Sequence, residues 1–175
     1  MATKNLNDDY FMSQLIDEQA WKNLSRDFQW SEQLLEKYAY KVDWHEVSGN
    51  EDMLWTASML EKFKDRIDWH ILSLRMKSSL LNAEMLERFE QYWDWHELSS
   101  RYSRMKLSSE LIDKFVERWD WSELIDSWDD ELFDEDFLKR YKEYIPASEL
   151  QSSNLWNVIV EKRKEQLANQ IANAA

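Results

Sequence analysis

The chain has 175 residues, no cysteine, and a formal net charge of −13 from 22 Lys and Arg against 35 Asp and Glu. This charge disfavours direct binding to nucleic acid or to an anionic membrane, because both need positively charged surfaces. No apolar run reaches the roughly 18 residues of a membrane span, and the start MATKNLNDDY has no secretory h-region. The absence of cysteine excludes disulfides and thiolate metal sites, and it is typical of a reducing compartment, so we expect a cytoplasmic protein.

One pattern recurs along the chain. A short polar residue opens each copy, and a tryptophan follows thirteen positions later in all but the last copy. The opening residues are Asp8, Ser31, Thr56, Asn82, Ser108 and Asp134, and the residues thirteen positions on are Trp21, Trp44, Trp69, Trp95, Trp121 and Ala147. Such a period predicts stacked repeats, here about 8–30, 31–55, 56–81, 82–107, 108–133 and 134–156, because one short unit cannot bury its apolar face alone.

The first half of each repeat predicts a helix. Apolar residues stand 3, 4, 7 and 11 places after the opening residue, which places them on one helical face. In repeat three these are Met59, Leu60, Phe63 and Ile67, and the other repeats from the second to the sixth follow the same spacing. The opening residue is the expected N-cap. The large apolar residue before it, such as Trp55, is spaced from Leu60 as in a hydrophobic staple.

The second half of each repeat predicts a shorter helix. We expect its N-caps to be Asp43, Asp68, Asp94 and Asp120, each directly before a tryptophan, with Glu46, Glu97 and Glu123 at the capping-box position. The ends deviate from the pattern: Ala20 precedes Trp21 in repeat one, and Pro146 takes the aspartate position in repeat six. After the last repeat, Asn157 is the predicted N-cap of a capping helix over about 157–172.

The predicted fold is therefore all-α: a solenoid of about six short helix-turn-helix repeats with a C-terminal capping helix, forming a single domain over residues 1–175. The pattern resembles the short helical repeats with a consensus near LSEDFIEKFKDKVDWxxIS that are abundant in giant-virus and some bacterial or phage proteins. The resemblance covers roughly residues 8–150, and Ile125 departs from it where the consensus has serine. It implies a repeat scaffold of viral or phage origin, located in the host cytoplasm, and it supplies no catalytic residues.

The motif Asp-Trp-His-x-x-Ser holds an acid, an imidazole and a hydroxyl within six residues. It occurs as Asp43/His45/Ser48, Asp68/His70/Ser73 and Asp94/His96/Ser99. A nucleophilic triad needs the base to contact the hydroxyl and the acid to orient the base, but here the aspartate is expected to cap a helix. Equivalent histidines in stacked repeats would stand about 8–10 Å apart, too far to share a metal ion. With Gly49 as the only glycine there is no phosphate loop, so we expect no enzyme, no cofactor and no metal site.

The tryptophans at the repeated position are expected to form the core between repeats, whereas Trp128 is less constrained and is expected to be partly exposed. Charge is the feature that varies most between repeats. The links that follow the second helices carry the partner-binding candidates: the basic residues Arg75, Lys77, Arg101, Arg104 and Lys106, and the acidic residues Asp129, Asp130 and Glu131. These residues are either solvated surface with weak ion pairs or the footprint of a partner.

Two functions from different classes stay open. The first is a non-enzymatic module that binds another protein through the charged links. The second is an acidic mimic of nucleic acid that inhibits a host defence enzyme acting on nucleic acid, which the net charge and the acidic segment 123–136 favour and the basic links oppose. A hydrolase built on Asp-x-His-x-x-Ser is a distant third. The sequence predicts no oligomeric state.

Overall fold

The computed structural model describes residues 9–128 and 130–173, and every regular element in that part of the chain is a helix. The chain is all-α, as its sequence predicts. Its contacts cluster into two compact units, Met1–Tyr92 and Trp93–Ala175. The single domain expected for residues 1–175 stays a prediction. Within the described residues, no helix combines the length and the apolar character needed to cross a membrane.

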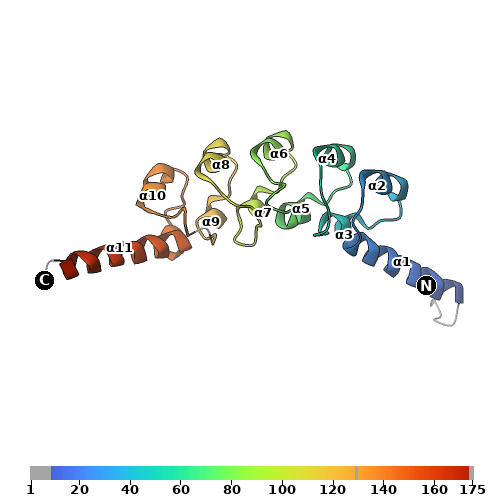
Figure 1. Cartoon of the computed structure of the whole chain (residues 1–175), viewed down its shortest axis with the longest axis horizontal. Helices are drawn as coiled ribbons and strands as arrows, with labels where there is room; N and C mark the ends of the chain where they lie inside the picture. The colour runs from blue at the N-terminus through green and yellow to red at the C-terminus, as the bar shows by residue number, and fades with distance from the viewer. Residues whose placement is uncertain (1–8, 129, 174–175) are drawn as a thin grey trace. The chain divides into compact units, whose positions relative to one another are not determined.

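The helices of both units are short except at the two ends of the described chain (Figure 1). The first unit contains α1 (Asp9–Asp27), α2 (Glu32–Tyr38), α3 (Trp44–Ser48), α4 (Ala57–Phe63), α5 (Trp69–Arg75) and α6 (Ala83–Arg88). The second contains α7 (Trp95–Ser99), α8 (Ser109–Lys114), α9 (Trp121–Leu124), α10 (Glu135–Tyr141), the 3₁₀ helix η1 (Leu150–Ser152) and α11 (Asn154–Asn173). In the first unit α3 contacts both α1 and α5, and in the second α7 contacts α9.

Within the repeats, the predicted N-caps are confirmed wherever the structure describes them. Ser31, Thr56, Asn82, Ser108 and Asp134 each accept a backbone N–H at the start of the first helix of their repeat. The four aspartates before the tryptophans cap the second helices in the same way. Asp8 lies outside the described residues. A helix of five to seven residues has too few internal hydrogen bonds to be stable alone, so these caps and the packing of its apolar face hold it.

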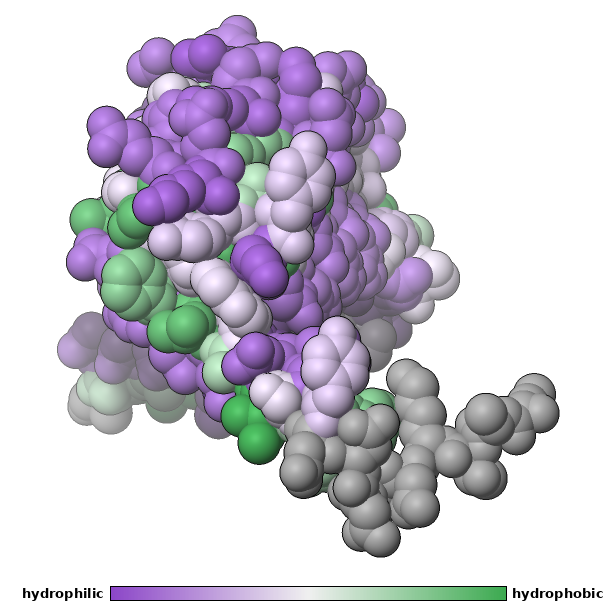
Figure 2. Space-filling view, turned by 90° about the vertical axis from the view of Figure 1, so that its right-hand side faces the viewer, coloured by the Kyte–Doolittle hydropathy of each residue, from purple (hydrophilic) through white to green (hydrophobic). Residues whose placement is uncertain are grey.

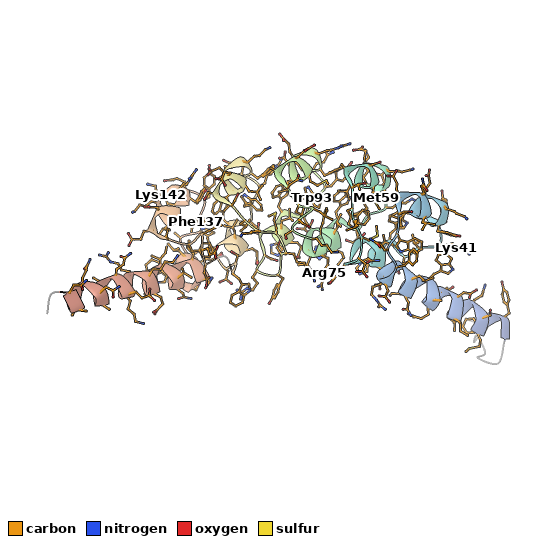
Figure 3. The ribbon with its side chains drawn as sticks, viewed as in Figure 1. Lys41, Met59, Arg75, Trp93, Phe137 and Lys142 are labelled. Atoms are coloured by element: carbon orange, nitrogen blue, oxygen red, sulfur yellow. The ribbon has the colours of Figure 1, made fainter. Side chains whose placement is uncertain are left out.

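The apolar positions of the first helices form the core of each unit. Leu35, Leu60, Leu86 and Ile112 are fully buried, and the staple residues before the N-caps, such as Trp55 and Phe133, are buried as well. Met59 lies among the packed side chains of its unit, whereas Arg75 lies at an edge (Figure 3). The core therefore includes many of the residues that the helical period singles out, together with residues outside that period, such as Met53 and Met105.

The two ends of the repeat pattern differ from the prediction of six helix pairs. Repeat one is a single helix, α1, because Ala20 offers no side-chain oxygen to cap a second helix before Trp21. In repeat six, Pro146 is followed by a turn and the short η1 instead of an α-helix. The last helix begins at Asn154, so the prediction of Asn157 as its N-cap is wrong.

Two hydrogen bonds at the start of α11 explain why the helix begins before Asn157. Ser153 Oγ accepts the N–H of Trp156 at 3.2 Å, and the N–H of Leu155 donates to the carbonyl of Ile125 at 2.9 Å. Ile125 stands where other repeats have a serine, so a backbone bond to α11 replaces the side-chain bond found elsewhere. Of the rest of α11, Leu155 and Ile159 are buried and residues 160–173 are exposed.

Helix α1, at the start of the first unit, is also mostly exposed, as α11 is in the second unit. The view in Figure 2 is mainly hydrophilic, with apolar side chains gathered in smaller patches. On α1, Tyr10 is 71% exposed and Ile16 is 63% exposed. Few residues of α1 therefore belong to the core, in keeping with the weak repeat pattern in this part of the sequence.

Candidate functional site

The Asp-Trp-His-x-x-Ser motif forms junctions between neighbouring repeats. Ser48 Oγ donates to the carbonyl of Trp44 at 2.6 Å and accepts the backbone N–H of Asp68, from the next repeat, at 2.9 Å. Ser25 forms the same two bonds with Trp21 and Asp43, and Ser99 forms them with Trp95 and Asp120. Ser48 and Ser99 are each 1% exposed, so each hydroxyl satisfies a backbone N–H that has little access to water.

The histidines complete these junctions. His45 Nδ1 lies 2.8 Å from Asp68 Oδ2, and His96 Nδ1 lies 2.9 Å from Asp120 Oδ2. Each histidine thus pairs with the aspartate of the following repeat and not with the one in its own motif. A hydroxyl has a single proton, and Ser48 donates it to a backbone carbonyl, so it does not donate to His45. The three residue types do not form a nucleophilic triad at these junctions.

The pairs shift the pKa values of their members. Burial raises the pKa of Asp120, but the hydrogen bonds from His96 and from the backbone N–H groups of Glu123 and Ser122 outweigh it, so this pKa lies below its usual value. The hydrogen bond to Asp120 raises the pKa of His96 despite some desolvation. Both shifts favour the charged pair. The pKa of Asp68 is also lowered: its hydrogen bonds from His45 and Ile71 N–H outweigh the opposing effect of burial.

The repeated tryptophans stack against aromatic residues of the next repeat. Trp44 contacts Phe63 with ring centroids 5.1 Å apart, Trp95 contacts Phe115 at 5.2 Å, and Trp121 contacts Tyr141 at 5.2 Å. The indole N–H of Trp44 donates to Ala39 O five residues earlier, which fixes the ring. These contacts lie between repeats, as expected, but the expected burial is found only for Trp121, at 7% exposure. The other four rings, Trp21, Trp44, Trp69 and Trp95, are half-buried.

A ladder of ion pairs, which the sequence analysis missed, joins the first helices of neighbouring repeats. Lys62 Nζ lies 2.7 Å from Glu36 of the preceding repeat, and Arg88 reaches Glu61 at 4.0 Å. In the second unit, Arg140 pairs with Asp113, which also accepts the hydroxyl of Tyr141 at 2.8 Å. Burial and this bond raise the pKa of Tyr141 to about 12. An acid five places and a base six places after the opening residue would have been the signal.

The junctions and ladders leave two surface pockets lined by link residues, one in each unit. In the first unit a pocket of 530 Å³ has more acidic than basic side chains in its lining: Asp27, Glu46, Glu51 and Asp52 against Arg26 and Arg75. In the second unit a pocket of 260 Å³ is lined by Arg101, Arg104 and Lys106 together with Trp128. The structure thus brings three of the five basic candidates together at one pocket.

The other candidate residues lie elsewhere. Lys77 is half-buried in the turn after α5. Asp130 holds α11, since Asn154 Nδ2 donates to its side chain at 2.8 Å and Lys162 Nζ donates to its carbonyl at 3.0 Å. Glu131 is exposed, and Asp129 lies outside the described residues. The acidic group is therefore in part a structural anchor.

Neither pocket holds a recognisable metal centre: the described part of the chain contains no group of three or more His, Asp or Glu side chains placed to hold an ion. What distinguishes the pockets is the sign of their charge. Both pockets include residues of the repeated motif, Ser99 in the second unit and His45 and Glu46 in the first, whereas their other charged residues belong to the variable links. A search of family models, curated proteins and solved structures finds no match to this chain.

Proposed function

We propose that this protein is a non-enzymatic module that binds another protein, built as an acidic α-solenoid of repeats of viral or phage type. The observation that carries the proposal is the junction itself. The acid, the hydroxyl and the imidazole of the motif are engaged with one another or with backbone across repeats, as at Ser48, Asp68 and His45. The residues that resemble catalytic groups therefore have a structural task, and the variable link residues are left to recognise a partner.

The repeated contacts support the solenoid part of the proposal. The same serine-to-aspartate bond and the same tryptophan stacking occur in both units. The sequence pattern continues from residue 82 to residue 107 with its spacing unchanged. Stacked repeats commonly bind through residues on one face, where variation does not disturb the core.

The charges of the links favour a partner whose association is steered by its own complementary charges. Complementary fields accelerate association and fix the register of two proteins more than they add affinity. The partner-binding candidates are the basic residues Arg75, Lys77, Arg101, Arg104 and Lys106 and the acidic residues Asp129, Asp130 and Glu131. We expect association to slow as salt is raised, because screening shortens the range of the field.

The test is affinity capture from the lysate of the native host, followed by identification of both proteins and nucleic acids. Substituting the five basic residues by glutamate should remove the captured protein. A control with Lys139→Glu and Lys142→Glu, both exposed and outside the two pockets lined by link residues, should retain it. Capture that is identical for all three forms would contradict a role for the basic links.

A second candidate is an acidic mimic of nucleic acid, favoured by the net charge of −13 and by the segment 123–136, which contains eight acids and no base. This function predicts a different result. The basic substitutions would have no effect, and added DNA or RNA would displace the chain from a captured enzyme that handles nucleic acid.

A further inference from the structure

The basic pocket of the second unit is lined by the end of α7, the segment between α7 and α8, and Ser127 and Trp128 after α9. Its cationic wall comes from Arg101, Arg104 and Lys106, within six residues of one another. Besides Trp128, the remainder of the lining consists of four serines and of the apolar residues Leu98, Met105 and Leu107. In a chain of net charge −13, such a cluster of bases around a concave surface selects an anionic group.

Two of the pocket's polar groups have distinct roles. Arg101 forms an ion pair with Asp126, and its guanidinium lies 5.6 Å from the Trp128 ring centroid, so it is held in place. Ser127 is 5% exposed, and its buried hydroxyl has no hydrogen-bond partner among the residues that the structure describes. A buried hydroxyl without a partner costs stability, and it can rotate to donate to an acceptor that enters the pocket.

Trp128 supplies the apolar part of the pocket. It is 69% exposed, in contrast to the tryptophans at the repeated position. An exposed indole beside fixed cations is typical of binding surfaces, because one large ring contributes much contact area at a small entropic cost. A ligand that places an apolar side chain on Trp128 and a carboxylate near Arg104 and Lys106 would use both features.

The size and surroundings of the pocket decide which anion it takes. A volume of 260 Å³ is below the roughly 300–1,000 Å³ of small-molecule sites, and it suits one or two side chains. A nucleic-acid strand carries a charge on every nucleotide and would also meet Asp126, Asp130 and Glu131 nearby in the sequence. A peptide carries its charges only on chosen side chains and avoids this repulsion.

We propose that this pocket binds an acidic peptide segment in which a glutamate or aspartate adjoins a large apolar residue. The carboxylate accepts hydrogen bonds from Arg104, Lys106 and the Ser127 hydroxyl, and the apolar side chain packs on Trp128. This inference rests on the proposed protein-binding function and names the chemistry of the partner at one site.

The test is a titration of the isotope-labelled full-length chain with the capped pentapeptide Gly-Glu-Phe-Glu-Gly, followed by NMR. We expect shifts of the Trp128 indole N–H and of the amides of residues 101–106. The matched peptide Gly-Gln-Phe-Gln-Gly should bind at least about tenfold more weakly, because it lacks the charges that the bases recognise. Ser127→Ala should weaken binding of the glutamate peptide without lowering the stability of the chain.

Two double variants distinguish the effect of the pocket residues from the effect of net charge on peptide binding. Arg104→Glu with Lys106→Glu should raise the Kd for the glutamate peptide about tenfold or more. Lys139→Glu with Lys142→Glu makes the same change of charge outside the pocket and should leave the Kd within about twofold. If the double variant in the pocket unfolds, Lys106→Gln alone provides the comparison.

Several outcomes would overturn the inference: equal binding of the two peptides, equal losses in the two double variants, or tighter binding of a short single-stranded DNA at the same residues. Failure here is distinguishable from failure of the proposed function. A protein captured through the basic links without peptide binding refutes only the pocket. Peptide binding without any captured protein leaves the pocket standing and refutes the partner search.

Discussion

The junctions between repeats and the links that follow the second helices differ in how much they vary. At the junctions, the same contacts recur at Ser25, Ser48 and Ser99, with the same donors and acceptors. In the links, the equivalent surface is an acidic pocket in the first unit and a basic pocket in the second. A residue that satisfies buried backbone has few substitutes, whereas a solvated link residue can change its charge at little cost to stability. The repeat pattern therefore reports structure, and the proposed function rests on the positions that depart from it.

The largest expected effect is at a buried junction tryptophan. Trp121→Ala removes a ring that is 7% exposed and packs on Phe137, Tyr141 and Tyr144. We expect the free energy of unfolding to fall by about 3–5 kcal/mol. Trp95→Ala should cost less, because that ring keeps an edge in solvent. Chemical denaturation of both variants measures the difference, and equal losses would contradict the junction geometry.

The next effect concerns the serine at the junction. Ser99→Ala leaves the N–H of Asp120 without its acceptor, which should cost about 1–3 kcal/mol of unfolding free energy. Ser58→Ala, an exposed helical position in α4, is the matched control and should change stability by less than about 0.5 kcal/mol. Urea titration with fluorescence detection compares the two. A loss in the control as large as that in Ser99→Ala would remove the special role of the junction serine.

A smaller effect is the dependence of stability on pH at the histidine pair. The pKa of His96 is raised in the folded chain, so its contribution is fully present below about pH 6.5 and is lost as the pH rises through the folded pKa. The pKa of Asp120 is lowered, so its contribution is present above about pH 3.9 and is lost as the pH falls through its folded value. The pair therefore stabilises the folded chain most between these two pH limits. Its contribution to the free energy of unfolding is at most about 1 kcal/mol, because His96 is largely exposed.

His96→Gln should remove this part of the pH dependence. The difference in melting temperature between the parent and the variant should be larger at pH 5.5 than at pH 8. A difference that grows toward pH 8 would show that the sign of the linkage is wrong. The comparison holds the other titrating groups constant, because both proteins contain them.

The smallest expected effect on stability belongs to the link. Trp128→Ala removes a ring that is 69% exposed, so we expect a change within about 0.5 kcal/mol of unfolding free energy. The same variant should weaken binding of the acidic peptide. A large loss of stability would place Trp128 with the junction residues and erase the contrast between the two regions.

The sequence by itself determined the local elements. The helical spacing of Leu60 and Phe63, the N-cap at Thr56 and the N-cap at Asp68 are all present in the structure, because caps and amphipathic faces depend on residues within a few positions of one another. The failures occur at the ends. There, Ala20 and Ile125 change a single residue of the pattern, and the chain continues as a helix or docks α11 through its backbone.

Only the tertiary structure decided which residues meet across repeats. The pairing of His45 with the next aspartate, the acid–base ladder of Glu36 and Lys62, and the pocket that joins Arg101 to Trp128 all connect positions about 23–27 residues apart. Such contacts depend on how one helix pair packs on its neighbour, and the spacing within a single repeat carries no record of that packing. That geometry gives the junction motif its structural role, and for this reason the proposed partner binding is assigned to the links.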